Sequence, residues 1–380
     1  MRKDNTNKIN KRIKLNKYKI KSRKRKLVSL VFNNKYKYIF ILVIILFTLF
    51  AHRQYSKGKR VGIIGFMPDT NIGNNLLKYS MYHFLNNLGF KPTLISLESP
   101  LNNDFLRKYL NIKEIRKFNQ LNENDFDILI VNSDQCWNSD FPGILELGFL
   151  SFAKNWNITK FVYAASLGHD SWNVSNNVIN SARELVKQFS DISVREETSI
   201  KIINNYLDVT PSFVLDPTFL LDKNDYLKII ENYKNEIDLK RDYICKFILD
   251  DSSILNDYIE KASKEINCEI LNIIPNNKNY IEKFIISIDI CKSIITDSFH
   301  GTIFSIIFNK PFLTFINIRR GNARFFSLNK TFNLNNRIIF PRKFVKKDVE
   351  ILMNAPRINK RKFNVFRRRS IKFLYKNLGI

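Results

Sequence analysis

Cysteine and histidine are both scarce in this chain, which has only four of each among its 380 residues. The cysteines, at positions 136, 245, 268 and 291, show neither CxxC nor CxxH spacing. This spacing indicates neither a zinc site nor a dense disulfide framework, so we expect no bound metal. The four cysteines leave the redox compartment of the protein open.

An excess of basic charge is missing from the middle of the chain, although the net charge is +27. Residues 1–60 carry 19 Lys and Arg against one acid, residues 342–380 carry 13 against two, and residues 61–341 carry 30 against 32. Nucleic-acid enzymes usually spread basic and stacking aromatic residues over their body, so we expect no nucleic-acid partner. Basic ends instead suit an anionic membrane surface, near which each Lys or Arg gains about 1 kcal/mol. A generally lysine-rich composition is the plainer explanation of the basic charge at the two ends.

An apolar run of full membrane-spanning length is also missing. The stretch Tyr38–Ala51 reads YIFILVIILFTLFA, whereas a transmembrane helix needs about 20 apolar residues. Lys37 can extend the stretch by snorkelling, and no small-x-small cleavage site follows it. We therefore predict a basic cytoplasmic tail over residues 1–37 and a single transmembrane anchor over residues 38–52. An interfacial or buried helix is the alternative.

The charges around this anchor predict its orientation. Fifteen Lys and Arg precede the apolar run and four follow it closely, so the N-terminus should lie in the cytoplasm. We expect a membrane protein whose body lies in a Golgi-type lumen if the source is eukaryotic, or an inner-membrane protein if it is bacterial.

Hydrophobic residues make up 44% of the chain and aromatic residues 13%, enough for two cores and against a disordered or fibrous protein. The run Arg60–Phe66, an Asn/Gly loop and a helical pattern over Leu76–Leu88 form the start of a βα unit. Strand-like runs then alternate with helix-sized intervals, and the pattern restarts after Pro211 and Pro217. We predict an α/β fold with two Rossmann-like domains, at residues 61–210 and 211–341, followed by a basic helical tail at 342–380.

A dinucleotide fingerprint is absent, because the loop Asn71–Asn75 is not GxGxxG and no acidic residue follows at the ribose position. We therefore expect no cofactor. The most informative segment is instead DSFHGT, from Asp297 to Thr302, between a buried strand and an apolar helix. This position places His300 near a helix N-terminus, which favours an anion nearby.

DSFHGT, followed by an apolar helix and NKPF, resembles a signature of the polysaccharide pyruvyl transferase family. The resemblance extends over most of residues 61–341. It includes four further segments besides the opening NIGNNLLKYSMYHFLNNLGF, namely SDQCWN, SVREETS, VLDPTFLL and GNARFFSL. It implies a fold similar to the two-domain GT-B glycosyltransferases. It also implies transfer of pyruvate from phosphoenolpyruvate, as a ketal, to two hydroxyls of one sugar in a glycan or glycolipid acceptor.

The resemblance also implies roles for particular residues. His300 matches the family histidine and would act as the general acid and base, because imidazole titrates near neutral pH. Arg195 and Arg324 would bind the two anionic ends of the donor, assisted by the hydroxyls of Ser298 and Thr302. Ketal-forming members tend to carry Arg-Leu-His where this chain has Ser298-Phe299-His300, so one donor arginine is missing. A salt bridge with a neighbouring carboxylate is the plainer role for Arg195, and a solvated surface charge for Arg324.

The acceptor sugar is expected on the first domain and the donor on the second. An indole can stack on a pyranose face while amides read its hydroxyls. The candidate acceptor-binding residues follow two strand ends and are Asn71, Gly73, Asn74, Asn75, Asp134, Gln135, Trp137 and Asn138. A capped helix with Trp137 in the core is the alternative for the second group.

Two other functions remain open. The same scaffold could transfer a sugar from a nucleotide sugar, although no Glu-x7-Glu donor motif is evident in the second half. The chain could also be a catalytically inactive, membrane-bound glycan-binding protein.

Overall fold

A computed structural model describes residues 39–43, 58–65, 71–97, 104–115, 117–132, 134–141, 143–231, 233, 242–274 and 279–380. The chain divides into two compact units, Met1–Lys57 and Gly58–Ile380, and the second contains both β-sheets. The predicted tail 1–37 lies outside the described residues, as does the predicted anchor 38–52 except for residues 39–43. Within the described residues, no helix is both long and apolar enough to cross a membrane.

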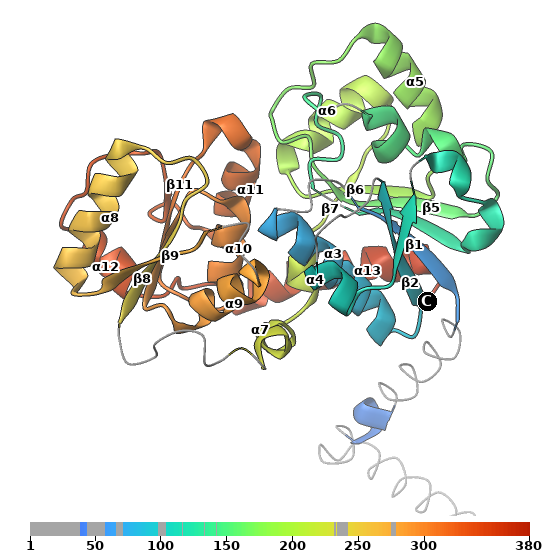
Figure 1. The fold of residues 1–380 in the computed structure, drawn as a ribbon. Helices are drawn as coiled ribbons and strands as arrows, with labels where there is room; N and C mark the ends of the chain where they lie inside the picture. The colour runs from blue at the N-terminus through green and yellow to red at the C-terminus, as the bar shows by residue number, and fades with distance from the viewer. Residues whose placement is uncertain are drawn as a thin grey trace, which may run out of the picture. The chain divides into compact units, whose positions relative to one another are not determined.

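Two sheets of parallel strands form the framework of the second unit (Figure 1). The first sheet has the order β3-β2-β1-β4-β5-β6-β7 and the second has the order β12-β11-β10-β8-β9. The predicted α/β fold with parallel sheets is confirmed. The strands are β1 (Arg60–Ile64), β2 (Lys91–Leu97), β3 (Ile112–Ile115), β4 (Ile128–Asn132), β5 (Thr159–Ala165), β6 (Asp191–Val194), β7 (Ser212–Phe213), β8 (Tyr243–Phe247), β9 (Glu269–Asn272), β10 (Ser293–Thr296), β11 (Phe312–Phe315) and β12 (Ile338–Ile339).

Helices connect the strands, as parallel pairing requires. Asn71, Ser175, Ser252 and Ser298 cap helices by accepting a hydrogen bond from a backbone N–H of the first turn. The described α-helices of this unit are α3 (Ile72–Asn87), α4 (Asp104–Tyr109), α5 (Asn176–Val186), α6 (Glu197–Leu207), α7 (Lys223–Leu227), α8 (Ser253–Ile266), α9 (Tyr280–Ile290), α10 (Phe299–Ile307), α11 (Ala323–Phe332), α12 (Asp348–Met353) and α13 (Lys360–Leu378). Shorter turns are η1 (Phe118–Gln120), η2 (Glu123–Asp125), η3 (Ile144–Gly148), η4 (Ser151–Ala153), η5 (Pro217–Leu220), η6 (Lys228–Ile230) and η7 (Ile318–Arg320).

Successive strand residues supply different cores because their side chains alternate between the two faces of a sheet. In β5, Phe161 and Tyr163 join the core beside α3 and α13, whereas Val162 and Ala165 join the core beside α5 and α6. Both faces of the first sheet are therefore covered. The second sheet is built in the same way, with α8 and α12 on one face and α9 and α10 on the other.

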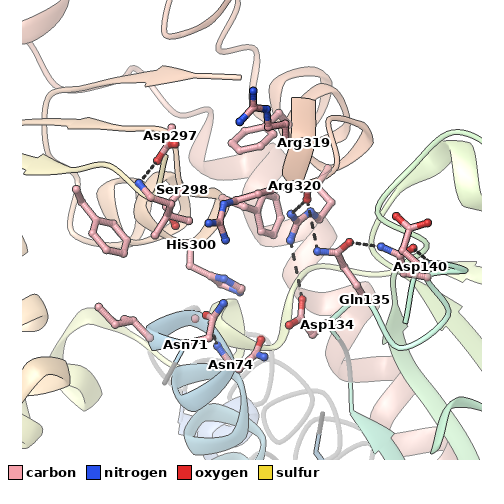
Figure 2. A pocket seen from close by; sticks show the side chains of 18 of the residues that line it. Asn71, Asn74, Asp134, Gln135, Asp140, Asp297, Ser298, His300, Arg319 and Arg320 are labelled. Atoms are coloured by element: carbon pink, nitrogen blue, oxygen red, sulfur yellow. Dashed lines mark hydrogen bonds and ion pairs between the residues drawn. The ribbon is translucent and has the colours of Figure 1, made fainter. Parts of the chain in front are cut away.

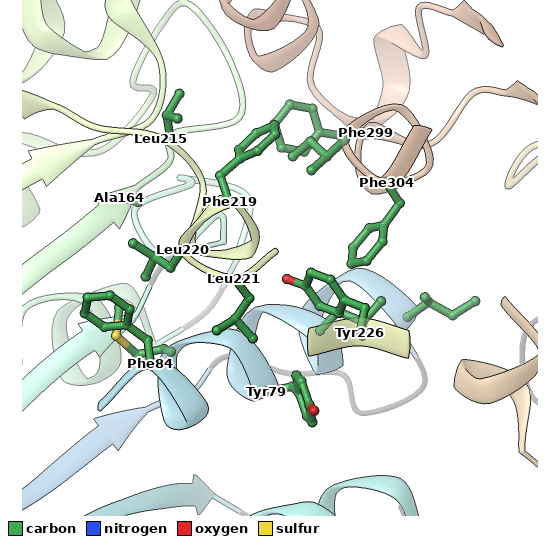
Figure 3. Close-up of a cluster of buried hydrophobic side chains, with 14 of the residues drawn as sticks. Tyr79, Phe84, Ala164, Leu215, Phe219, Leu220, Leu221, Tyr226, Phe299 and Phe304 are labelled. Atoms are coloured by element: carbon green, nitrogen blue, oxygen red, sulfur yellow. The ribbon is translucent and has the colours of Figure 1, made fainter. Parts of the chain in front are cut away.

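One continuous apolar core joins the two sheets (Figure 3). It runs from α3 through η5 to α10. The ring of Tyr226 lies 4.8 Å from that of Phe304, and the ring of Phe219 lies 5.5 Å from that of Phe332. Burying aromatic rings of this size is a large apolar contribution, so the core holds the carboxyl ends of the two sheets in one unit.

The C-terminal helix α13 returns to the first sheet. Phe373 places its ring 6.2 Å from Phe161 and 6.1 Å from Tyr163, both on β5. The Ser370 hydroxyl also accepts a hydrogen bond from the Leu215 N–H at 2.8 Å. The chain therefore crosses to the second sheet and ends against the first.

The structure pairs Cys245 with Cys291 in a buried disulfide, while Cys136 and Cys268 are free and buried. The paired residues lie 46 apart in sequence, and their Cα atoms are 5.8 Å apart. They meet because β8 pairs with β10, which begins two residues after Cys291. Sequence spacing alone gave no indication of this contact.

Candidate active site

The carboxyl ends of strands from both sheets surround a cavity of about 580 Å³ (Figure 2). Its lining comes from the turns after β4, β8 and β10, from the start of α3 and from the loop before α11. Ligands of doubly wound sheets bind at such strand ends. This cavity is therefore the candidate active site.

The DSFHGT turn is fixed by hydrogen bonds to neighbouring strands. Asp297 accepts from the N–H groups of Leu249 and Asp250, at 2.6 and 3.1 Å, and from the Asn317 amide at 2.9 Å. Ser298 caps α10 by accepting from the Gly301 N–H. These hydrogen bonds fix the position of the turn, and His300 becomes the second residue of α10.

His300 is buried and lies at the boundary between the two sheets, opposite the first turn of α3 (Figure 2). A Cβ atom on Gly73 would lie 1.9 Å from His300 Nδ1, so only glycine allows the ring to approach the helix this closely. The N-termini of α3 and α10 both begin at this cavity. Two helix N-termini together favour a bound anion.

Asp216 lies behind the imidazole of His300. Its Oδ2 atom is 3.7 Å from His300 Nε2, an ion-pair distance but too long for a hydrogen bond. The N–H and hydroxyl of Thr218 both donate to Asp216 Oδ1, at 3.0 and 2.7 Å. Burial alone would raise the pKa of Asp216, but its interaction with His300 and the charge of Arg195 outweigh burial and hold that pKa well below its usual range. Asp216 is therefore a fixed carboxylate beside the histidine.

Arg195 is the cation that neutralises this carboxylate. Its guanidinium donates to Asp216 at 2.6 Å, to Asp134 at 3.0 Å and to Glu196 at 3.3 Å. Its side chain is 1% exposed, and it does not line the cavity. Burial alone would lower the pKa of Arg195, but the three neighbouring carboxylates outweigh burial and raise it. Arg195 thus forms the centre of a buried ion cluster.

Arg324 is buried as well, but it is far less neutralised. Its nearest described carboxylate is Asp134, at 3.9 Å, and its Nε atom has no hydrogen-bond partner among the described residues. Burial and the charge of Arg195 lower the pKa of Arg324 to about 10. Arg324 lines the cavity, and its guanidinium stacks 5.1 Å from the Phe299 ring, on which Arg195 also stacks at 5.0 Å. A bound anion would complete the neutralisation of Arg324.

The first-domain wall of the cavity is polar. The Asn138 amide donates to Gln135 Oε1 at 2.6 Å, and the Gln135 amide reaches the Arg320 carbonyl across the cavity at 3.5 Å. Beyond them His169 and Asp140 pair at 3.1 Å. These groups offer donors and acceptors suited to sugar hydroxyls.

Most of the predicted site residues lie together in this cavity. Its lining contains Asn71, Gly73, Asn74, Asp134, Gln135, Asn138, Ser298, His300 and Arg324. Four other predicted residues do not line it, namely Asn75, Trp137, Arg195 and Thr302.

Trp137 lies in the core, where the sequence prediction of a sugar platform is wrong. It is 1% exposed, its indole N–H donates to the Gly148 carbonyl at 2.7 Å, and its ring stacks on Phe149 at 4.6 Å. A buried indole with a satisfied N–H belongs to the hydrophobic core.

Thr302 and Asn75 have internal partners instead of a ligand. The Thr302 hydroxyl donates to the Ser298 carbonyl at 2.9 Å and lies 2.8 Å from the Thr314 hydroxyl. The Asn75 amide donates to the Tyr280 hydroxyl at 2.7 Å. Both side chains are fully buried, so neither is placed to bind donor or acceptor.

Sequence reasoning missed Asp216 and the pair formed by Asp140 and His169. Asp216 lies three residues beyond the end of β7 and precedes a proline, within the segment VLDPTFLL. Its position at a strand end was the available signal. Asp140 and His169 lie in separate loops, and their spacing carried no signal.

A sequence profile of the polysaccharide pyruvyl transferase family matches residues 71–318. A search of curated protein sequences found no match. Among solved structures, a Listeria monocytogenes protein assigned as a UDP-N-acetylglucosamine 2-epimerase is 12% identical with a TM-score of 0.52, and the match covers 82% of this chain and 91% of that one. Anabaena Alr3699/HepE in complex with UDP-glucose is 10% identical with a TM-score of 0.49, covering 84% and 100%. S. aureus MnaA with UDP is 12% identical with a TM-score of 0.48, covering 85% and 97%.

Two parallel α/β sheets with a cavity at their carboxyl ends define a GT-B-like fold, and the Listeria structure agrees with this fold. Because the family profile covers well over half of the chain, the chain belongs to the polysaccharide pyruvyl transferase family. It is therefore a transferase that modifies glycans.

The contrast between the two buried arginines predicts opposite effects on stability. Arg195→Met leaves Asp216 and Asp134 without their cation, so we expect the free energy of unfolding to fall by about 3–5 kcal/mol. Arg324→Met removes a poorly neutralised cation, so we expect that free energy to rise by about 1–3 kcal/mol while inorganic phosphate binds at least about tenfold more weakly. Urea denaturation followed by tryptophan fluorescence, with calorimetry for phosphate, measures both. Equal destabilisation by the two changes would assign Arg324 a purely structural role.

The close approach of Gly73 to His300 predicts a coupled pair. Gly73→Ala displaces the imidazole, so we expect turnover to fall by about 10²-fold. His300→Ala in the same chain removes the clash, so the double variant should recover the stability lost by Gly73→Ala but not the activity. Thermal unfolding and turnover of the two single variants and the double variant provide the test. Additive losses of stability would show that the two residues are not coupled.

Proposed function

We propose that the protein transfers the pyruvyl group of phosphoenolpyruvate to two hydroxyls of one sugar in a glycan or glycolipid, forming a ketal. The observation that carries this proposal is the arrangement of His300 between Asp216 and the cavity that Arg324 lines. It supplies a proton carrier and a cation to a substrate that needs protonation and carries two anionic groups.

The donor would bind at the second-domain side of the cavity. Ser298 stands where ketal-forming relatives tend to carry arginine, so Arg324 and the N-termini of α3 and α10 become the principal anion-binding groups. Arg319, which also lines the cavity, is exposed and could reach the phosphate. These groups suit the carboxylate and the phosphate of the donor.

The chemistry would proceed through proton transfer at His300. A proton from the imidazole adds to C3 of the enol, which makes C2 electrophilic. The first sugar hydroxyl attacks C2 and gives its proton to the imidazole, which restores His300, and the C2–O bond to phosphate breaks. The second hydroxyl then closes the ketal, and its proton leaves with the phosphate. The Asp216 carboxylate would orient the ring, as a carboxylate does beside a catalytic histidine.

The acceptor would bind at the first-domain wall. Asn71, Asn74, Gln135 and Asn138 offer amides at this wall, and the pair of Asp140 and His169 extends it. The cavity volume of about 580 Å³ accommodates a small donor together with one sugar.

Incubation of the full chain with phosphoenolpyruvate and a panel of glycosides tests the proposal. Phosphate release that depends on the glycoside, with a pyruvylated product by mass spectrometry, is the expected result. The same panel with UDP-sugars tests the alternative of glycosyl transfer. UDP release with a glycosylated product, and no reaction of phosphoenolpyruvate, would replace the proposal with that alternative.

Substitution of His300 tests the proton carrier. We expect His300→Ala to lower turnover by about 10² to 10⁴-fold, because a positioned acid and base contributes that much. His300→Gln should be nearly as inactive, since glutamine cannot carry a proton. His83, on α3, is the control, because it does not line the cavity and His83→Gln should retain turnover. Unchanged turnover of His300→Ala would remove the mechanism.

We further propose that residues 38–52 anchor the protein in a membrane, with the N-terminus in the cytoplasm and the body on the opposite side. The asymmetry of charge around this segment supports the orientation. The Cys245–Cys291 disulfide also fits an oxidising compartment, which the cytoplasm is not.

Membrane extraction tests the anchor. The full chain should stay in the pellet after carbonate washing at high pH, whereas a chain lacking residues 38–52 should be released. Protection of the C-terminus from protease in sealed vesicles should accompany retention. Complete extraction of the full chain would exclude a transmembrane anchor.

A further inference from the structure

The outward face of α13 is a cationic surface whose role the catalytic cavity does not explain. Residues 354–380 contain no Asp or Glu. Arg361, Val365, Arg368, Lys372 and Lys376 follow one another at helical spacings of three or four residues, and all are exposed. These residues therefore form one solvent-facing stripe, here named the α13 stripe.

The opposite face of α13 is buried against the first sheet, so the stripe cannot turn inward. Its buried residues are Ser370, Phe373, Leu374, Asn377 and Leu378. No described carboxylate lies within ion-pair distance of Arg361, Arg368 or Lys372. The α13 stripe thus keeps at least three cations without an acidic partner in the described part of the chain.

The C-terminal end of the α13 stripe lies at the edge of the first sheet where the strands begin. Lys376 pairs at 2.7 Å with Asp191, the first residue of β6. Because the sheet is parallel, the start of β1 at Arg60 lies at this same edge. Asp127, which precedes β4 at the edge, is neutralised by Arg60 at 3.0 Å. The two acids that flank these strand starts are therefore both paired with bases.

The chain also enters the body at this edge. Only residues 53–57 separate the proposed anchor from Gly58, and five residues span at most about 18 Å. The proposed anchor would therefore tether the chain to the membrane through the residue that precedes β1. The cavity lies at the opposite, carboxyl edge, so a membrane beside α13 would leave it open to a glycan.

We propose that the α13 stripe docks on anionic lipid of the non-cytoplasmic leaflet of the membrane that anchors the chain, and that this leaves the cavity uncovered. The proposal rests on the anchor at residues 38–52 and not on the transferred group. The cationic stripe is complementary to lipid phosphates, and none of its residues lines the cavity, which argues against the acceptor glycan of that cavity as its partner.

The test uses the full chain in nanodiscs of phosphatidylcholine with or without 30% phosphatidylglycerol, a composition chosen for the assay. A fluorophore on Val365→Cys reports contact with a headgroup quencher, and a fluorophore on Ile254→Cys, exposed on α8, is the control. We expect quenching at position 365 only in the anionic discs, and none at position 254.

A charge variant then separates docking from simple tethering. Replacing Arg361, Arg368 and Lys372 with Gln should lower the ratio of docked to undocked protein on the order of 100-fold, since each cation contributes about fivefold. A matched variant with Gln at three exposed lysines elsewhere, Lys201, Lys261 and Lys264, should keep the quenching.

Three results would overturn the proposal. Equal quenching at position 365 in neutral and anionic discs would show that the anchor alone brings α13 close to the lipid. Quenching retained in the Arg361, Arg368 and Lys372 variant would mean that these charges do not contribute to docking. Shielding of position 365 by a soluble acidic polysaccharide, without any effect of the lipid, would assign the surface to a glycan. Carbonate extraction of the same preparation shows separately whether the anchor itself has failed.

Discussion

The ion pair between Arg195 and Asp216 is the interaction on which the candidate site depends. Asp134, Arg195 and Asp216 follow three strands, β4, β6 and β7, so the guanidinium fixes three strand ends of the first sheet relative to one another. Asp216 then extends to His300 on the second sheet. All of these groups are desolvated, and charges in such surroundings are stable only when they are paired. The geometry of the histidine therefore depends on an arginine that does not line the cavity.

Much of this fold can be predicted from the sequence, because strands, helices and caps are specified by residues close together in the chain. Long apolar runs such as Phe126–Val131 and Lys160–Ala165 correspond to β4 and β5, which are buried on both faces. The short strands β3, β7 and β12 have two to four residues and are partly exposed, so they carry little apolar signal. The prediction of a polar turn at DSFHGT was also correct, because adjacent residues specify the strand end, the Ser cap and the apolar helix.

The direction of each side chain at the site could not be predicted in the same way. Position at a strand end places a residue near the cavity, but tertiary partners decide whether it faces the cavity or the core. Trp137 turns inward because the Gly148 carbonyl satisfies its indole N–H, and these residues meet only after folding. Arg195 turns away because Asp216, 21 residues later, neutralises it. Arg195 is therefore placed to hold strand ends together, whereas Arg324 lines the cavity and stays a predicted anion ligand.

The unequal neutralisation of the two arginines connects stability with ligand binding. Both guanidinium groups stack on the Phe299 ring, and both lie near the same oxygen of Asp134, Arg195 at 3.0 Å and Arg324 at 3.9 Å. Arg195 takes most of the available carboxylate charge, and Arg324 is left with a lowered pKa. An empty site therefore contains a buried cation that its surroundings do not fully stabilise. An anion in the cavity would supply the missing charge, so binding would stabilise the protein as well as position the substrate. Lower stability of the unliganded protein is characteristic of functional sites, because their residues are selected to bind a ligand rather than to give the greatest stability.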